Sequence, residues 1–90
     1  MSIKKQVLTQ LKEIQDLIRD NIDTLNNLIK QSQNLSSVIN DNADHKMNEE
    51  TINKLTEIKK QIDEDIKKSQ TFISSLTDKY NILIETLFVF

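Results

Sequence analysis

Histidine, carboxylate and hydroxyl side chains are the groups of this chain that could carry out chemistry. His45 is the only histidine, and it follows Asp41 and Asp44 in a polar segment. A catalytic or metal-binding histidine needs partner groups that converge on one point, and an exposed segment does not supply them. The run Asp41-Asn42-Ala43-Asp44 looks like the start of a calcium loop but lacks the central glycine and final glutamate of that motif. We expect no metal site.

The other reactive groups are spread around helical segments. Asp63, Glu64 and Asp65 are consecutive, and consecutive residues of a helix point in different directions, so they cannot act as an acid-base pair. No histidine is placed to activate serines such as Ser36 or Ser74. The chain has no glycine with which to build a phosphate-binding loop. We therefore expect neither an enzyme nor a cofactor-binding protein.

Apolar residues recur alternately three and four positions apart in both halves of the chain. The first series is Val7, Leu11, Ile14, Ile18, Leu25, Leu28, Leu35 and Ile39, and the second is Ile52, Leu55, Ile62, Ile66, Ile73, Leu76, Tyr80, Leu83 and Leu87. Such spacing is typical of helices that pack along heptad positions a and d. The sequence therefore predicts two long helices, each with one packing seam.

A polar segment, residues 40–48, separates the two series. Its Asn and Asp side chains compete with helical hydrogen bonding. Asn40 or Asn42 is suited to end the first helix, and Asn48 is suited to cap the second. We expect an all-α, single-domain helical hairpin of two long antiparallel, coiled-coil-like helices, with helices over residues 3–40 and 49–88 and a turn over 41–48. One continuous helix is the alternative, because no glycine or proline forces a turn.

A rod of two helices has one contact seam and no enclosed core. Without cysteine, a disulfide cannot stabilise it. We therefore expect additional burial from a protein partner, in a homodimeric four-helix bundle or a hetero-oligomer.

Polar residues also occupy the seam. A turn near residues 43 and 44 places residue i opposite residue 87 minus i, so that Val7 would face Tyr80. The polar seam residues, expected to specify the register, then gather at two heights: Asn21, Ser32, Lys59 and Ser69. A polar residue in a seam can fix register or partner number. The alternative is that Lys59 extends to solvent while the serines only leave room; we prefer that alternative for Lys59 and the specifying role for Asn21.

Apolar residues outside the seam exceed what one hairpin can cover. Leu8, Ile22 and Ile29 fall at e, whereas Leu17 and Val38 fall at g. The residues expected to bind a partner are Leu8, Leu17, Ile22, Ile29, Phe72, Ile82, Ile84, Leu87, Phe88, Val89 and Phe90. In the expected register only residues 1–5 lie beside the apolar C-terminal end. A contiguous exposed apolar surface usually marks a contact site. The alternatives are a frayed end that covers its own hairpin and a weak peripheral membrane contact.

Charge and hydropathy restrict the partner class. The net charge is −2 with 29% charged residues, and no basic stripe with interleaved aromatic residues is apparent, so we expect no nucleic-acid binding. Lys4 and Lys5 are not followed by the apolar run of a Sec signal peptide. The apolar end is shorter than the roughly 20 residues that span a bilayer. We expect a soluble, cytoplasmic chain without a transmembrane segment.

Length, helical plan and a turn near the midpoint resemble the small hairpins of the WXG100, or ESAT-6-like, secretion partners. At the turn, where that family has Trp-x-Gly, this chain has Asn40 to Asn48; after Tyr80, the acidic position of Tyr-x-x-x-Asp/Glu is Ile84. The resemblance implies a secretion cargo or targeting partner of a larger exported protein. That function is the alternative to our main expectation, a non-enzymatic interaction or adaptor module that acts through helix-helix association.

Overall fold

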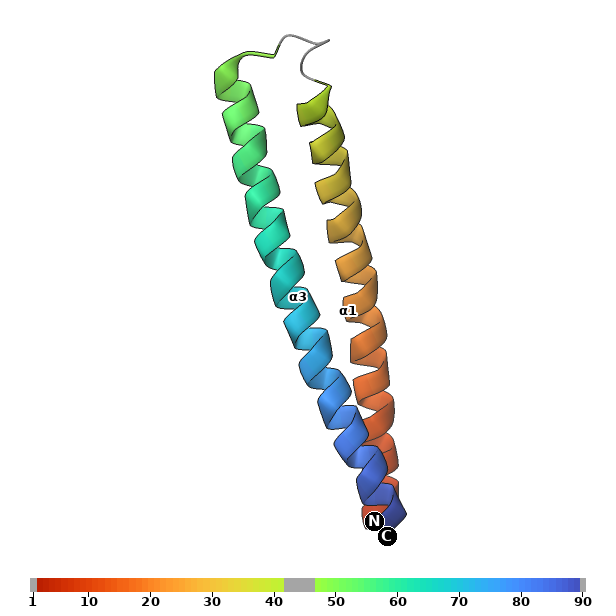
Figure 1. Cartoon of the computed structure of the whole chain (residues 1–90). Coiled ribbons are helices and arrows are strands. Elements are labelled where there is room, and N and C mark those ends of the chain that lie inside the picture. The colour runs from red at the N-terminus through yellow and green to blue at the C-terminus, as the bar shows by residue number, and fades with distance from the viewer. Residues whose placement is uncertain (1, 42–46, 90) are drawn as a thin grey trace.

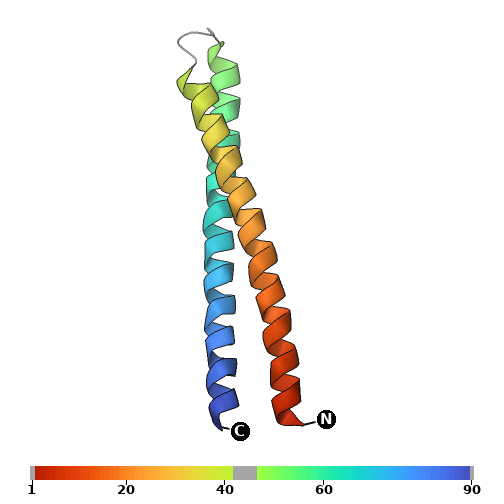
Figure 2. The same cartoon turned by 90° about the vertical axis from the view of Figure 1, so that its right-hand side faces the viewer.

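The computed structural model describes residues 2–41 and 47–89, which form two long helices side by side (Figure 1). Helix α1 covers Ile3–Asn40 and helix α3 covers Glu49–Val89. The helices run antiparallel, so Ile3 and Val89 lie at the same end of the rod (Figures 1 and 2). The helical hairpin predicted from the heptad pattern is confirmed, and the alternative of one continuous helix is wrong.

Both helices begin at a side-chain cap. The Ser2 hydroxyl accepts a 3.1 Å hydrogen bond from the Lys5 N–H, and the Asn48 side-chain oxygen accepts a 2.7 Å bond from the Thr51 N–H. Each bond satisfies an amide that has no partner within its helix. Glu49 follows the second cap, at the helix end where the dipole favours negative charge. The predicted capping role of Asn48 is confirmed.

The C-cap residue of helix α1, Asp41, is not in the left-handed conformation. Asn40 is its last residue, and Asp41 follows with φ −80° and ψ 2°. The Asp41 N–H still donates a 2.9 Å hydrogen bond to the Ser37 carbonyl, so the helical pattern of hydrogen bonds continues to this residue. In the polar segment 40–48, Asn42, Asp44 and His45 lie outside the described residues.

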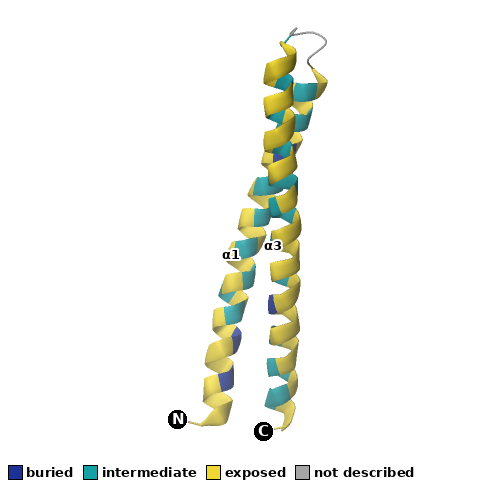
Figure 3. Ribbon diagram, turned by 90° about the vertical axis from the view of Figure 1, so that its left-hand side faces the viewer, coloured by how far each residue is buried: buried dark blue, intermediate teal, exposed yellow. Residues whose placement is uncertain are grey.

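The hairpin is a thin rod. Its extents are 65 × 17 × 14 Å and its radius of gyration is 20.0 Å, whereas a compact domain of this length would have about 12 Å. Among residues 2–41 and 47–89, the buried apolar side chains are Val7, Leu11 and Leu76, and the polar residue Ser32 is also buried. Half-buried residues follow the strip where the two helices face each other, and exposed residues cover the rest (Figure 3). The two helices therefore pack against each other along a narrow seam.

The register of the two helices differs from the prediction. Gln15 Nε2 donates a 2.9 Å hydrogen bond to the Tyr80 hydroxyl, and the Ser32 hydroxyl donates a 2.6 Å bond to Oδ1 of Asp63. The residue numbers of each pair add to 95, where 87 was expected, so the predicted pairing of Val7 with Tyr80 is wrong by about one heptad. A shift of one heptad still brings a positions against d positions, so the apolar pattern alone cannot detect it.

The shift changes what lies at both ends of the rod. At the turn, α3 begins beyond the end of α1 in both views (Figures 1 and 2). At the other end, the segment 82–89 lies beside residues of about 6–13 in α1, where residues 1–5 had been expected. A groove lined by Gln10, Ile14, Lys79, Ile82 and Leu83 crosses the two helices there, in agreement with this register.

Candidate association surface

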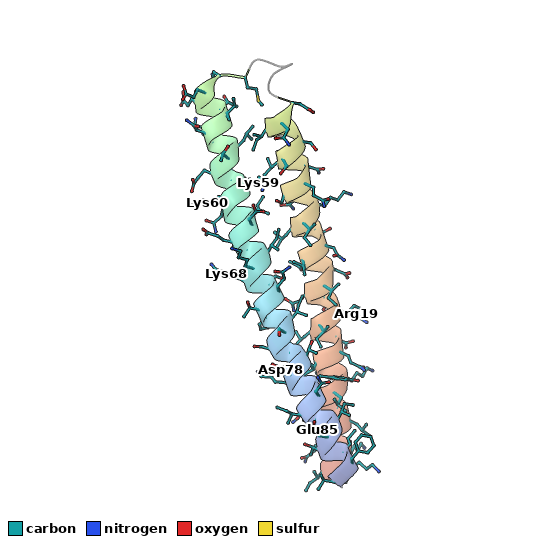
Figure 4. All side chains as sticks on the ribbon, in the orientation of Figure 1. Arg19, Lys59, Lys60, Lys68, Asp78 and Glu85 are labelled. Atoms are coloured by element: carbon teal, nitrogen blue, oxygen red, sulfur yellow. The ribbon has the colours of Figure 1, made fainter. Side chains whose placement is uncertain are left out.

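A polar cluster joins the two helices in the half of the rod nearer the turn. Asp63 of α3 accepts the hydrogen bond from Ser32 of α1 on Oδ1 and a 2.7 Å bond from Lys59 Nζ on Oδ2. The hydrogen bonds from Lys59 and then Ser32 lower the pKa of the Asp63 carboxyl, helped by the charges of Lys59 and Lys67 and opposed by partial desolvation. Lys59 lies between the helices (Figure 4). The cluster connects the two helices, because the Asp63 carboxylate accepts one hydrogen bond from α1 and one from its own helix, α3.

The four predicted register residues therefore divide into two pairs. Ser32 and Lys59 meet at Asp63, although in a register other than the predicted one. Asn21 donates a 2.7 Å hydrogen bond to the Leu17 carbonyl of its own helix, and within the described residues its side chain makes no bond to α3. The Ser69 hydroxyl oxygen is buried and has no hydrogen-bond partner among the described residues. That Asn21 specifies register stays a prediction.

The two sides of the hairpin differ in character. In an antiparallel pair, the e positions of both helices border the seam on one side and the g positions border it on the other; we call these the e side and the g side. Both interhelical side-chain hydrogen bonds of the described residues use an e residue, Gln15 in one case and Asp63 in the other. Polar bonds therefore connect the helices along the e side.

The g side is apolar and open. Ten large apolar side chains of the described residues are exposed. Those at g, together with those at the neighbouring c positions, are Ile3, Leu17, Val38, Ile58, Phe72, Ile82 and Val89. The other three, Leu8, Ile22 and Phe88, border the e side. Most of the uncovered apolar surface thus lies along one side of the rod.

Most of the residues predicted to bind a partner are exposed in the structure, but on two different sides of the hairpin. Exposed on the g side are Leu17, Phe72, Ile82 and Val89, and exposed on the e side are Leu8, Ile22 and Phe88. Ile29, Ile84 and Leu87 are half-buried, and Phe90 lies outside the described residues. Ile3, Val38 and Ile58 were missing from the predicted set. All three residues lie at heptad position g, which the sequence already indicates. That shared position identifies one side of the hairpin only when the pairing of the two helices is known.

Charged residues form a different rim on each side. Position b borders the e side, and its charged residues are all basic: Lys5, Lys12, Arg19, Lys60 and Lys67. Position c borders the g side, and within the helices it carries Glu13 and Asp20 on α1 but Lys54 and Lys68 on α3. Figure 4 labels residues of both rims, with Arg19 on the outer face of α1 and Lys60 and Lys68 on the outer face of α3. The e side is bordered by one sign of charge and the g side by both.

Within residues 2–41 and 47–89, no group of three or more potential ligands could hold a metal ion. In the same described ranges, neither helix has a stretch apolar enough to cross a membrane. No protein family model, curated protein or solved structure shows a significant match to this chain.

Proposed function

We propose that this chain is a non-enzymatic protein-association module that packs the g side of its hairpin against further helices. One observation carries the proposal: of the residues that the structure describes, three apolar side chains are buried and seven large ones are exposed along a single side. Large exposed apolar side chains gathered along one side of a soluble protein usually mark a contact site.

The pattern of side chains matches what a helical bundle requires. Each helix of a four-helix bundle buries its a and d positions together with e or g, a wider stripe than a simple two-helix seam. Here the a and d positions form the seam between α1 and α3, and the apolar g positions would supply the additional width. Complete burial of a Leu or Phe side chain contributes about 1.5–3 kcal/mol, and Leu17 and Phe72 are 46% and 48% exposed. These side chains have about half of that contribution left to gain.

The simplest partner is a second copy of the chain, which would form a four-helix bundle. In a hetero-oligomer, helices of another protein would take the place of the second copy. Both forms use the same surface and mechanism, the burial of an apolar stripe between helices.

Sedimentation equilibrium tests the proposal with two matched variants. The g-side variant, Leu17→Gln with Phe72→Gln, removes two large apolar side chains from the g side. The e-side variant, Leu8→Gln with Ile22→Gln, removes two large apolar side chains of similar exposure from the e side. We expect the unchanged chain to dimerise at micromolar concentration, the g-side variant to be monomeric, and the e-side variant to dimerise.

Circular dichroism of each variant checks that the helices are retained. A fully helical, unchanged chain that stays monomeric up to sub-millimolar concentration would contradict association with a second copy. Loss of the dimer in the e-side variant alone would show that the wrong surface was chosen.

A further inference from the structure

We propose that a second copy occupies the g side with the two-fold axis parallel to the rod, so that both turns lie at the same end and α1 packs against α3 of the second copy. This inference rests on the proposed function and adds the identity of the partner and its orientation. Three observations carry it: the exposed area, the signs of charge on the e side and the g side, and the position of Lys79 relative to two acidic residues.

The exposed area fits an interface of ordinary size. The chain exposes 6847 Å², whereas a compact monomer of its mass would expose about 5,400 Å². A stable protein interface removes about 800 Å² from each partner. The excess of about 1,400 Å² is therefore sufficient for one such interface on this chain.

The e side is unsuited to a second copy. Its rims carry Lys and Arg at position b of both helices, and packing e side against e side would bring these charges together in either orientation. The g side carries acids at position c of α1 and bases at position c of α3, and Asp65 and Lys79 lie at g of α3. Two g sides can therefore meet without placing like charges together, provided that α1 lies on α3.

Apolar residues of the g side gather at three levels. Ile3 and Val89 lie near the chain ends, Leu17, Phe72 and Ile82 lie toward the middle, and Val38 and Ile58 lie near the turn. A two-fold axis parallel to the rod places each level of one copy beside the same level of the second copy. An axis perpendicular to the rod exchanges the two ends and also brings apolar levels together. Apolar matching therefore permits both orientations.

The charges distinguish the two orientations. Lys79 lies at g of α3 and lines the groove on the g side, at the level of residue 16 of α1 in the observed register. With the parallel axis, its side chain lies between Glu13 and Asp20 of the second copy. With the perpendicular axis, Asp20 comes within about one helical turn of Asp20 of the second copy. Within the described part of the chain, Glu13 and Lys79 form no ion pair, so both are available for an intermolecular one.

Distances between labels test the orientation directly. The chain has no cysteine, so Ser37→Cys, at an exposed position near the turn, introduces a single labelling site. With the parallel axis, two nitroxide labels at this site are separated by about 25–35 Å across the bundle. With the perpendicular axis they lie at opposite ends, more than about 40 Å apart. Thr9→Cys, near the chain ends, should also give the short distance.

Charge reversal gives a second readout. Lys79→Glu alone, or Glu13→Lys with Asp20→Lys, should raise the dimer dissociation constant about threefold to tenfold at low salt, and the effect should shrink at high salt. Combining all three substitutions should restore the original dissociation constant. A retained fold, checked by circular dichroism, accompanies each measurement.

The outcomes separate this inference from the proposed function. A dimer with long label distances, or one indifferent to these charges, overturns the orientation and leaves the association module standing. A dimer broken by the e-side variant of Leu8 and Ile22 overturns the choice of surface. A monomer overturns the second copy as the occupant of the g side, and the association module then stands only with helices of another protein.

Discussion

The Ser32 hydroxyl of α1 donates a 2.6 Å hydrogen bond to Asp63 of α3, eight residues further along the second helix than the Leu55 that the apolar pattern had placed opposite it. The contact depends on the register, because Asp63 accepts hydrogen bonds from both Ser32 and Lys59 in the observed alignment of the helices. At concentrations where the chain is monomeric, unfolding measurements report on the hairpin alone.

The hydrogen bond between Ser32 and Asp63 should appear as energetic coupling. We expect Ser32→Ala and Asp63→Asn each to lower the free energy of unfolding, and the double variant to lose less than the two losses combined, because each substitution already removes the shared bond. Urea unfolding of the four chains measures this. Ser37→Ala, at an exposed position of the same helix, provides a control pair whose effects should add to those of Asp63→Asn. Additive behaviour of Ser32 and Asp63 would contradict the role of the bond.

The contribution of Asp63 should depend on pH. Its carboxyl has a lowered pKa in the folded state, so the folded chain holds the proton less tightly than the unfolded chain does. The stabilisation is therefore complete above the unfolded pKa of about 3.9 and is lost as the pH falls through the folded pKa. We expect the difference in urea midpoint between the unchanged chain and Asp63→Asn to be constant from neutral pH to about pH 4 and to shrink in more acidic solution. A difference that grew with acidification would contradict this sign.

Removing the Ser69 hydroxyl should stabilise the hairpin. Its oxygen is buried without a partner in the described structure, and a buried unsatisfied polar group costs about 1–3 kcal/mol. We expect Ser69→Ala to raise the free energy of unfolding by about 1 kcal/mol, measured by urea unfolding. Ser74→Ala, at an exposed helical position, controls for helix propensity and should gain no more than about 0.5 kcal/mol. A less stable Ser69→Ala chain would show that the hydroxyl has a bound partner, such as water.

The Asn48 cap should be measurable by substitution. Asn48→Ala removes the acceptor for the Thr51 N–H, and we expect a loss of about 1 kcal/mol of unfolding free energy. Asn53→Ala serves as the matched control, because Asn53 is exposed within the helix and alanine is the better helix former. It should leave stability unchanged or slightly increased. Equal effects of the two substitutions in thermal unfolding would argue against the cap.

The candidate surface was predictable in part. Heptad positions identified Leu17 and Phe72 as apolar residues outside the seam, and their exposure agrees with that reading. The predicted set nevertheless mixed e residues such as Leu8 with g residues and omitted Ile58. Two flanking residues on different helices share a side only if the helices pair in a particular way. Heptad positions assigned to each helix separately do not contain that pairing.

The sequence by itself determined the two helices, the seam residues and the cap at Asn48, because heptad spacing and capping depend on residues within a few positions of one another. The tertiary structure decided the register and the contrast between a polar-bonded e side and an open apolar g side. Those features depend on contacts between distant residues, such as Ser32 with Asp63 and Gln15 with Tyr80. Registers one heptad apart bury the same classes of seam residue, so their difference lies in a few polar contacts that exist only when both helices are in place.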